Sequence, residues 1–464
     1  MRCSRKIWDL SLERDGISCS KVGLFETGGT ACEGLWNQIS RNPMMEASAT
    51  RKCLDIRNSS HEILPRRVDE MSEQQGEKPV YLDGFATLPL APAARTAMLA
   101  VWDQPGNAGS PNGSGERAAQ IVAAGRAAVA DLIGATPGEI TFTSGATEAN
   151  NLAMMGVARA IRQIEPNRRK ILISAIEHKA VIEPARELER EGFIVETIPV
   201  TSSGVIDLDA LKRMSKDDLA LASAMLINNE LGTIQPIGEA CEIVHAVGGR
   251  MHTDAAQAVG KVHLDVADLD IDYLSLSGHK AYGPMGIGAL YVAAGALKPN
   301  AQLFGGGQQS GLRPGTEPVA LIAGFGAAAL VAKSALADGS AHGAELLTVL
   351  LDELRKNQVR FLIPSSHAPR VPGGIALLLP GTDGDALCAR LASKVSISTG
   401  SACTSGQIRT SHVLESIGLS EHDARSVVRI FCNRYNTVDE VRLAARLIAD
   451  AVRRSSLATG GRHQ

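Results

Sequence analysis

Several side chains that could carry out chemistry stand at the ends of short apolar segments. Lys280 and Asp254 end two of these segments, in SLSGHK and RMHTD, and His178 and Asn229 end two others. A lysine removed from water can lose its proton and react with a carbonyl group, and a carboxylate can pair with a cationic ring nitrogen. Each residue also has an ordinary explanation, as an exposed lysine, a helix cap or a packed histidine. Their shared position is what makes a common site the better interpretation.

The segment TSGATE at 143–148 adds a place for an anion. It follows a predicted strand and opens a predicted helix, so backbone N–H groups and the hydroxyls of Ser144 and Thr147 can reach a negatively charged group. Alone, this pattern is weak evidence, because small residues also cap helices for structural reasons. Together with Lys280 and Asp254 it describes a site for pyridoxal phosphate, which needs an N–H cradle, a lysine and an acidic partner for its ring nitrogen.

These side chains can meet only if strands bring them to one edge of a sheet. From about residue 117, helical stretches alternate with short strand-like runs, which indicates an α/β fold with a mostly parallel sheet covered on both faces. In such sheets, ligands bind beyond the carboxyl ends of the strands. The predicted strands are EITFTS, ILISAI, FIVETIPV, SAMLINN, RMHTDA, DYLSLS and GIGALYV.

The alternating pattern also suggests a division into domains. We expect a large domain over 90–337, and a smaller α+β domain made from 71–89 and 338–464. Residues 1–70 show no sustained period, and Cys3, Cys19, Cys32 and Cys53 are too far apart for the usual zinc spacing. We expect this segment to be disordered or to result from a start codon assigned too far upstream.

Composition excludes several classes of protein. The formal net charge of −3 gives no basic surface for nucleic acid, and no apolar run reaches the roughly 18 residues that span a bilayer. Eight cysteines in 464 residues are too few for a disulfide scaffold. We therefore expect a cytoplasmic enzyme with no direct contact to nucleic acid or membrane.

From about Tyr81 to Arg434 the chain resembles the cysteine desulfurases of the class V aminotransferase superfamily, in the group of the iron–sulfur-cluster and nitrogen-fixation enzymes. The resemblance implies a homodimer with the type I fold of pyridoxal-phosphate-dependent transferases, which resembles aspartate aminotransferase. The matching stretches are YLDGFAT, FTSGATEANNLA, EHKAV, NNELGTIQPI, HTDAAQAVGK, SLSGHKAYGPMGIGALYV, GGGQQSGLRPGTEPV and STGSACTSG.

The resemblance also implies how the cofactor is held. Lys280 would bind pyridoxal phosphate covalently, Asp254 would pair with its ring nitrogen, and Gln257 would contact its ring hydroxyl. Asn229 would lie beside both cofactor and substrate. The phosphate would be bound by Ala146, Thr147, Ser277 and His279, with Thr316 contributed by the partner subunit.

On the substrate side, the resemblance implies that His178 stacks on the cofactor ring and moves protons, while Asn229 and Arg429 bind the carboxylate of L-cysteine. Cys403 lies in STGSACTSG, whose small polar residues indicate a loop with an accessible thiol. By resemblance, Cys403 attacks the substrate sulfur, leaving L-alanine and a persulfide for an acceptor protein, either an iron–sulfur scaffold or a thiolation factor. We expect no intrinsic metal site, although Cys403 could transiently ligate an iron–sulfur cluster.

Three segments depart from the family pattern. They are GFATLP at 84–89, Asn112 where the family usually has histidine, and RIFCNR at 429–434, where small residues usually follow the arginine. These changes leave two alternatives open. One is a pyridoxal-phosphate-dependent lyase or aminotransferase acting on another amino acid, such as selenocysteine. The other is a non-catalytic paralogue, although the presence of both Lys280 and Cys403 speaks against it.

Overall fold

A computed structural model describes residues 11–13, 16–18, 78–400 and 411–460. It divides the chain into two units, Met1–Gly76 and Glu77–Gln464. In the first unit, strands β1 (Ser11–Glu13) and β2 (Gly16–Ser18) form an antiparallel hairpin that the sequence pattern does not predict. The rest of our expectation for residues 1–70 lies outside the described residues. All features below belong to the second unit.

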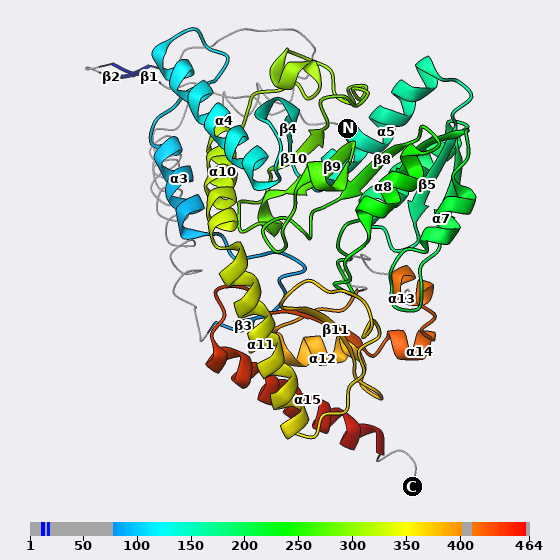
Figure 1. Cartoon of the computed structure of the whole chain (residues 1–464). Coiled ribbons are helices and arrows are strands. Elements are labelled where there is room, and N and C mark those ends of the chain that lie inside the picture. Colours follow the sequence, from blue (N-terminus) through cyan, green and yellow to red (C-terminus); the bar gives the residue numbers. More distant parts are fainter. Residues whose placement is uncertain (1–10, 14–15, 19–77, 401–410, 461–464) are drawn as a thin grey trace, which may run out of the picture. The chain divides into compact units, whose positions relative to one another are not determined.

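A seven-stranded sheet occupies the centre of this unit, with the strand order β4-β10-β9-β8-β7-β5-β6 (Figure 1). Neighbouring strands from β9 to β6 run parallel, and β10 runs antiparallel to both β4 and β9. The mostly parallel sheet predicted from the sequence is therefore confirmed. Its strands are β4 (Ile140–Thr143), β5 (Lys170–Ser174), β6 (Ile194–Ile198), β7 (Leu219–Ser223), β8 (Arg250–Asp254), β9 (Tyr273–Ser277) and β10 (Gly288–Val292).

One predicted strand is misplaced. The sequence pattern predicts a strand at SAMLINN, 223–229, but β7 is Leu219–Ser223, so the strand ends where the prediction begins. The apolar run continues from Leu219 to Ile227 without alternation. Such a run gives no period from which to locate the end of a strand.

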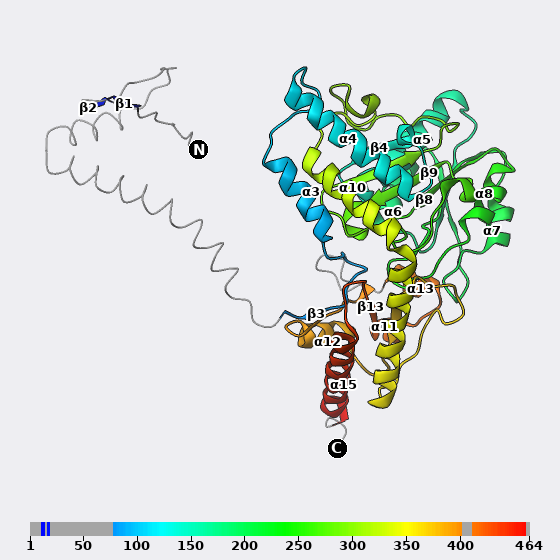
Figure 2. The same cartoon turned by 60° about the vertical axis from the view of Figure 1, so that its left-hand side comes forward.

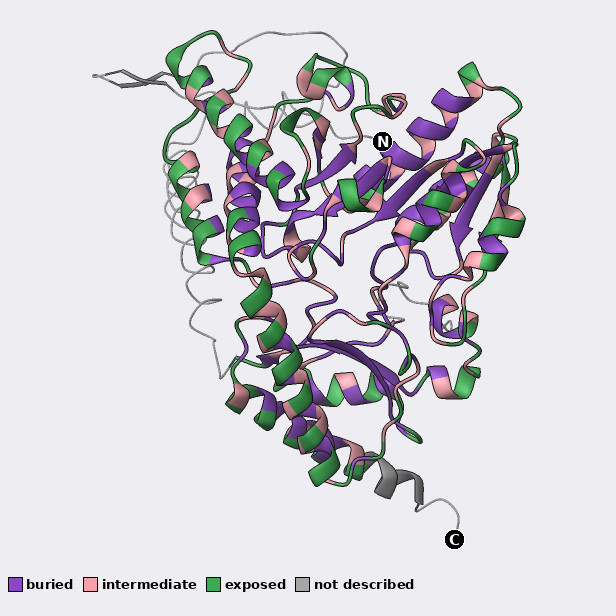
Figure 3. Ribbon diagram, viewed as in Figure 1, coloured by how far each residue is buried: buried purple, intermediate pink, exposed green. Residues whose placement is uncertain are grey.

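The strands form here because they are apolar on both faces. In β5, Ile171 and Ile173 pack on one side with helix α5 (Ala146–Ile164), while Leu172 packs on the other. Successive side chains of a strand point to opposite faces, so a sheet covered by helices needs an apolar residue at nearly every position. Figure 3 shows these strands as buried throughout most of their length.

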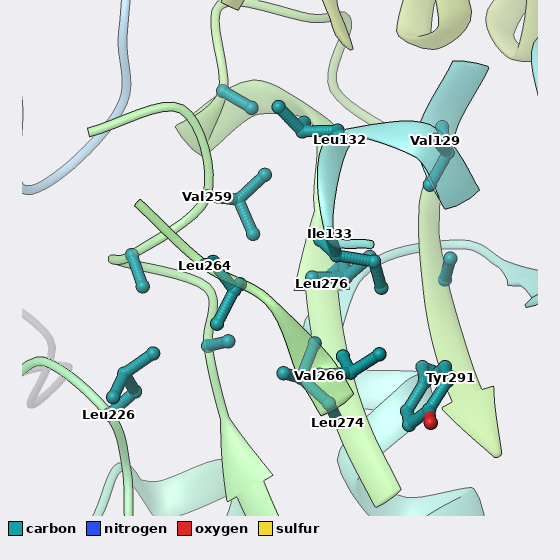
Figure 4. Close-up of a cluster of buried hydrophobic side chains, with 14 of the residues drawn as sticks. Val129, Leu132, Ile133, Leu226, Val259, Leu264, Val266, Leu274, Leu276 and Tyr291 are labelled. Atoms are coloured by element: carbon teal, nitrogen blue, oxygen red, sulfur yellow. The ribbon is translucent and has the colours of Figure 1, made fainter. Parts of the chain in front are cut away.

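Helices cover both faces of the sheet. Helices α5 and α6 supply the core of one face, and α4, α8 and α10 supply that of the other. Figure 4 shows part of the second core, where side chains after and within α4 meet those of β9 and β10. The helices of this lobe are α3 (Pro92–Trp102), α4 (Gly113–Leu132), α5, α6 (Lys179–Arg190), α7 (Leu208–Met214), α8 (Ile237–His245), α9 (Val266–Leu269) and α10 (Val319–Ser334).

A smaller lobe has its own hydrophobic core, formed by short strands and by helices α11, α12 and α15 (Figure 2). Strand β11 pairs with β13 antiparallel, and β12 pairs with β3 parallel. The elements are β3 (Val80–Tyr81), α11 (Leu336–Lys356), β11 (Gly374–Leu378), α12 (Gly384–Leu391), β12 (Val395–Ser396), α13 (His412–Ser416), α14 (Glu421–Ala424), β13 (Val427–Phe431) and α15 (Val438–Gly460). We propose the domain boundary at 337/338 on the basis of these separate cores.

Residues 80–91, which we call the 80–91 arm, connect the two lobes. Its strand β3 pairs with β12 of the small lobe, while Leu88 N–H donates to the carbonyl of His279 at 3.0 Å and Ala91 N–H to that of Tyr282 at 2.8 Å. The arm therefore crosses the carboxyl edge of the large sheet.

Among the described residues, no single helix is long and apolar enough to span a bilayer. Helices α10 and α11 pass a test of length and composition only as a pair, and that pair is bent by 74°.

Candidate active site

A cavity of about 500 Å³ lies at the carboxyl ends of the sheet strands. Residues from several strand ends, from the start of α5 and from the small lobe line it. Of the residues predicted for cofactor and substrate, those lining it are Ala146, Thr147, His178, Asn229, Asp254, Gln257, Ser277, His279, Lys280 and Arg429. The structure thus brings together groups that are up to 283 positions apart in the sequence, from Ala146 to Arg429.

Two predicted residues are not among them. Thr316 is exposed and does not line this cavity. Its proposed contact with the cofactor of a partner subunit stays a prediction. Cys403 lies outside the described residues.

One end of the cavity is formed by the first turn of α5. Gly145 caps this helix without any side-chain hydrogen bond, and the following residues Ala146 and Thr147 line the cavity. The N–H groups of a first helical turn point along the axis and favour an anion. Gly145 lies so close to β10 that a Cβ on Gly288 would be 2.6 Å from its Cα. Close packing of two backbones fixes this turn.

An ion pair stabilises the same turn from the outside. Glu148 accepts a hydrogen bond from Arg313 Nε at 2.8 Å and another from the backbone N–H of Ser144 at 2.8 Å. Burial raises the pKa of Glu148, but the hydrogen bonds from Arg313 and Ser144 outweigh burial, and the net shift is downward. Arg313 therefore neutralises a carboxylate beside the predicted phosphate site.

Lys280 meets the backbone of the 80–91 arm. Its ammonium group donates to the carbonyls of Phe85 and Ala86, the latter at 2.7 Å. Gln257 donates from its amide to the same Phe85 carbonyl at 2.8 Å, and its oxygen accepts from Lys261 Nζ at 2.6 Å. Two residues predicted to contact the cofactor are thus positioned by a single carbonyl of the arm.

Asp254, at the end of β8, is held by two donors. Asn150 Nδ2 donates to one of its oxygens at 2.7 Å, and the N–H of Ala256 donates to the other at 2.9 Å. The side chain is buried yet lines the cavity. Both hydrogen bonds fix the orientation of this carboxylate at the wall of the cavity.

A second carboxyl group lies behind Asp254. Glu177 is fully buried, and neither of its carboxyl oxygens has a hydrogen-bond partner of normal geometry among the described residues. Burial and the charge of Asp254 raise its pKa well above the ordinary value, against the weaker influence of nearby N–H groups and the Ser223 hydroxyl. The neutral form of Glu177 is therefore favoured.

His178 caps helix α6 with its ring. Because the N–H of Ala180 donates to Nδ1 at 3.1 Å, Nδ1 must be the unprotonated nitrogen and Nε2 carries the proton in the neutral ring. Burial lowers the pKa of His178, and the charge of Lys280 acts in the same direction. The ring is thus neutral near pH 7, with Nε2 as its exchangeable position.

Arg429 enters the cavity from the small lobe and is almost completely buried. Its Nε donates to Ser398 Oγ at 2.7 Å, and its Nη1 donates to the backbone carbonyl of Asn229 at 3.1 Å. Ser398 in turn donates to Asp83 at 2.6 Å. This chain of contacts joins the small lobe, the arm and the large lobe around one guanidinium group.

His279 is also neutral. Its Nδ1 is 3.0 Å from the hydroxyl of Thr87, and burial, together with the charges of Lys280 and Lys261, lowers its pKa to about 4. A neutral imidazole can donate a hydrogen bond to an anion without contributing a full charge.

Two of the three segments that depart from the family pattern, 84–89 and 429–434, pack against each other as one unit. The ring of Phe431 lies edge-on to that of Phe85, with centroids 5.2 Å apart, and a Cβ on Gly84 would be 2.4 Å from Phe431 Cδ1. Glycine at 84 is therefore needed once phenylalanine occupies 431. This unit also contacts residues predicted to bind the cofactor, because the Phe85 carbonyl accepts from both Lys280 and Gln257.

Asn112, the third departure from the family pattern, does not line the cavity. Asn112 is exposed and caps α4, accepting a hydrogen bond from the N–H of Gly115 at 2.9 Å. Asparagine is among the best residues at this position of a helix.

Sequence reasoning missed several supporting residues. Asn150 and Glu148 stand within the matching stretch FTSGATEANNLA, and Glu177 precedes His178, so the motifs contained a signal for them. Ser398, Phe85 and Lys261 also stand within matching stretches, but the motifs did not indicate their contacts. Ser398 and Phe85 meet partners that are distant in the sequence, whereas Lys261 meets Gln257 four positions away.

Comparison with known proteins shows the family to which this chain belongs. The sequence pattern of the family Aminotransferase class-V matches residues 80–443, so the chain belongs to the class V aminotransferases. The α/β fold predicted for that class is confirmed.

Within this class the chain belongs with the cysteine desulfurases. It is 40% identical to "Cysteine desulfurase" of Mus musculus over 381 residues, which cover 81% of this chain and 82% of that protein. Among solved structures, a "NIFS-like protein" is 32% identical with a TM-score of 0.74, covering 80% of this chain and 98% of that one. The solved structure of "SspA in complex with cysteine" is 35% identical with a TM-score of 0.67, covering 77% and 99%.

Proposed function

We propose that this protein uses pyridoxal phosphate to remove sulfur from L-cysteine, giving L-alanine and a persulfide on Cys403. The observation that carries the proposal is the joint presence of Lys280, Asp254 and the open first turn of α5 around one cavity. These are the lysine, the acidic partner and the anion site that this cofactor requires.

The described residues fit the cofactor in size and in chemistry. The cavity of about 500 Å³ is within the range of ordinary small-molecule sites. Asp254 is held by two donors and favours a cationic ring nitrogen, and Gln257 lies beside Lys280 on the same carbonyl. The phosphate would meet the first turn of α5, with further contacts from Ser277, His279 and Thr316 of a partner subunit.

Arg429 and Asn229 would bind the substrate carboxylate. The guanidinium group is already oriented by Ser398 and by the Asn229 carbonyl, so little freedom is lost when a carboxylate binds. When bound, pyridoxal phosphate withdraws electrons from the substrate carbon skeleton. His178 Nε2 and the Lys280 amine are the groups of this chain that can hold or move protons there.

Cys403 would supply the nucleophile. Its thiolate attacks the sulfur of the substrate, an S–S bond forms, and the carbon–sulfur bond breaks with its electron pair remaining on carbon. A proton on that carbon completes L-alanine. The overall reaction converts cysteine and a thiol into alanine and a persulfide, so no external oxidant is needed.

The proposal also covers the sulfur acceptor, the cellular compartment and the oligomeric state. The persulfide would be passed to an acceptor protein, an iron–sulfur scaffold or a thiolation factor, and the enzyme would act as a cytoplasmic homodimer. The similarity to "SspA in complex with cysteine" supports cysteine as the ligand of the cavity. The alternative of another amino-acid substrate has no specific observation in its favour.

The test separates the two chemical roles. The full chain is incubated with L-cysteine without reductant, alanine is quantified, and added sulfur is located by mass spectrometry. Lys280→Ala should abolish the yellow colour of the cofactor-bound protein, whereas Cys403→Ser should keep the colour and lose the persulfide. Cys388→Ser is the matched control, because this thiol lies in α12 and burial raises its pKa to about 12. A colourless Cys403→Ser protein, or persulfide on another cysteine, would contradict the assignment.

A further inference from the structure

A second, smaller cavity lies behind the active site, where the two lobes meet. It has a volume of about 20 Å³, enough for one water-sized particle. Its walls come from the turn after β8, the turn after Lys280, the start of α11 and the segment after β13. They are Gly260, Lys261, Tyr282, Ala335, Gly339, Ser340, Pro372, Phe431, Cys432 and Arg434.

Two cationic side chains line this cavity, and no carboxylate of the described residues does. Lys261 is 5% exposed, and its Nζ lies 5.0 Å from the centre of the Phe431 ring. Arg434 stacks on Tyr282, with 3.6 Å between Cζ and the ring centre. Within the part of the chain that the structure describes, neither side chain forms an ion pair.

The guanidinium group of Arg434 lacks the hydrogen bonds that burial requires. Both Nη1 and Nη2 are shielded from solvent, and neither has a hydrogen-bond partner among the described residues. Burying an uncompensated charge is costly, and arginine cannot relieve the cost by losing its proton. Stacking on an aromatic ring offsets only part of it.

We infer that this cavity binds a single small anion of the size of chloride, between Arg434 and Lys261. The anion accepts hydrogen bonds from the Arg434 guanidinium and balances the charges of both side chains. The small volume favours a monatomic anion over larger oxyanions such as phosphate.

The anion site is connected to the active site through Lys261. Lys261 lines the small cavity, its ammonium group donates to Gln257 Oε1 at 2.6 Å, and Gln257 lines the large cavity. An anion beside Lys261 favours its protonated, donating form, against the burial and the Lys280 charge that lower the pKa of Lys261. The bound ion would therefore help to orient Gln257.

Halide-dependent stability tests the inference without using activity. Thermal unfolding of the cofactor-bound full chain is compared in sodium chloride and sodium gluconate at equal ionic strength. With chloride at tenfold its dissociation constant, the folding equilibrium of the native protein should shift about 11-fold toward the folded state. Arg434→Gln should lose this chloride dependence.

The matched control is Arg355→Gln. Arg355 also lies over an aromatic ring, with 5.5 Å from Cζ to the centre of Phe361, but it is exposed and paired with Asp352 at 2.9 Å. This variant should keep the chloride effect of the native protein. An equal effect of chloride on Arg434→Gln and on Arg355→Gln would overturn the inference, because it would show a general salt effect.

A second measurement uses the native protein alone, so that the test does not depend on the folding of a variant. Crystals soaked in sodium bromide should show an anomalous peak within hydrogen-bond distance of Arg434 Nη1 or Nη2. A water molecule there, or a carboxylate from elsewhere in the chain or from a second copy, would refute the anion site. Lys261→Met provides a second variant, and its halide affinity should be reduced.

Discussion

Gly84 should tolerate no side chain while Phe431 is present. A Cβ at position 84 would lie 2.4 Å from Phe431 Cδ1 and 2.9 Å from Leu88 Cδ2. Phe431 is 3% exposed and packs against Phe85, so its ring has little space into which to turn. Overpacking of this kind costs about 1–3 kcal/mol. Gly84→Ala should therefore destabilise the protein by about that amount.

A double-mutant cycle tests whether the Phe431 ring causes this loss of stability. Phe431→Ala alone should cost about 3–5 kcal/mol, as expected for a buried phenylalanine. In that background the clash with Phe431 is gone and only the close contact with the flexible end of Leu88 remains, so Gly84→Ala should cost much less than in the native protein. Alanine also restricts the unfolded chain, which offsets part of the remaining cost. The coupling energy should thus be about 1–3 kcal/mol, within the range found for residues in contact.

Urea denaturation followed by far-ultraviolet circular dichroism, at a saturating concentration of cofactor, gives the four free energies of unfolding. Gly138→Ala is the control, because a Cβ there meets no atom within 4 Å. If Gly84→Ala costs the same with and without Phe431, the packing argument is wrong.

Two further predictions concern charge. Burial lowers the pKa of His252 from 6.5 to about 3, so its contribution to stability is complete above pH 6.5 and is lost as the pH falls toward 3, by at most about 1.4 kcal/mol per pH unit. His252→Gln should flatten the dependence of unfolding free energy on pH in this window, and an unchanged slope would contradict the assignment. Arg313→Gln leaves Glu148 without its charged partner beside the predicted phosphate site, and the lost hydrogen bonds are worth about 1.5–3 kcal/mol. We expect at least about tenfold weaker cofactor binding by absorbance titration, whereas unchanged affinity would show that this ion pair does not support the site.

The sequence was sufficient to predict the sheet and the residues that lie at its carboxyl edge. Strand ends are marked by a change from apolar to small or polar residues, as at Asp254 and Lys280, and parallel strands bring such ends together. The misplaced strand before Asn229 shows the limit of this reasoning, since a continuous apolar run has no period.

The supporting contacts could not be predicted, because they depend on packing between distant segments. The Phe85 carbonyl meets Lys280 195 positions away, and nothing in the local sequence of either residue indicates this. Lys261 illustrates a different difficulty. Lysine is almost always exposed, so a buried lysine behind the active site runs against the expectation for its type.

The position of the 80–91 arm has a consequence for the order in which the protein can fold. Although the arm is synthesised early, its strand pairs with Val395–Ser396, and the carbonyl of Leu82 accepts from the N–H of Phe431. These partners leave the ribosome more than 300 residues later, so the arm has no sheet to join until synthesis is nearly complete. The carbonyls of Phe85 and Ala86 are then among the last groups to reach Lys280. A nascent chain can thus assemble most of the large sheet while its reactive lysine remains unsupported, and cofactor capture becomes a late event in its maturation.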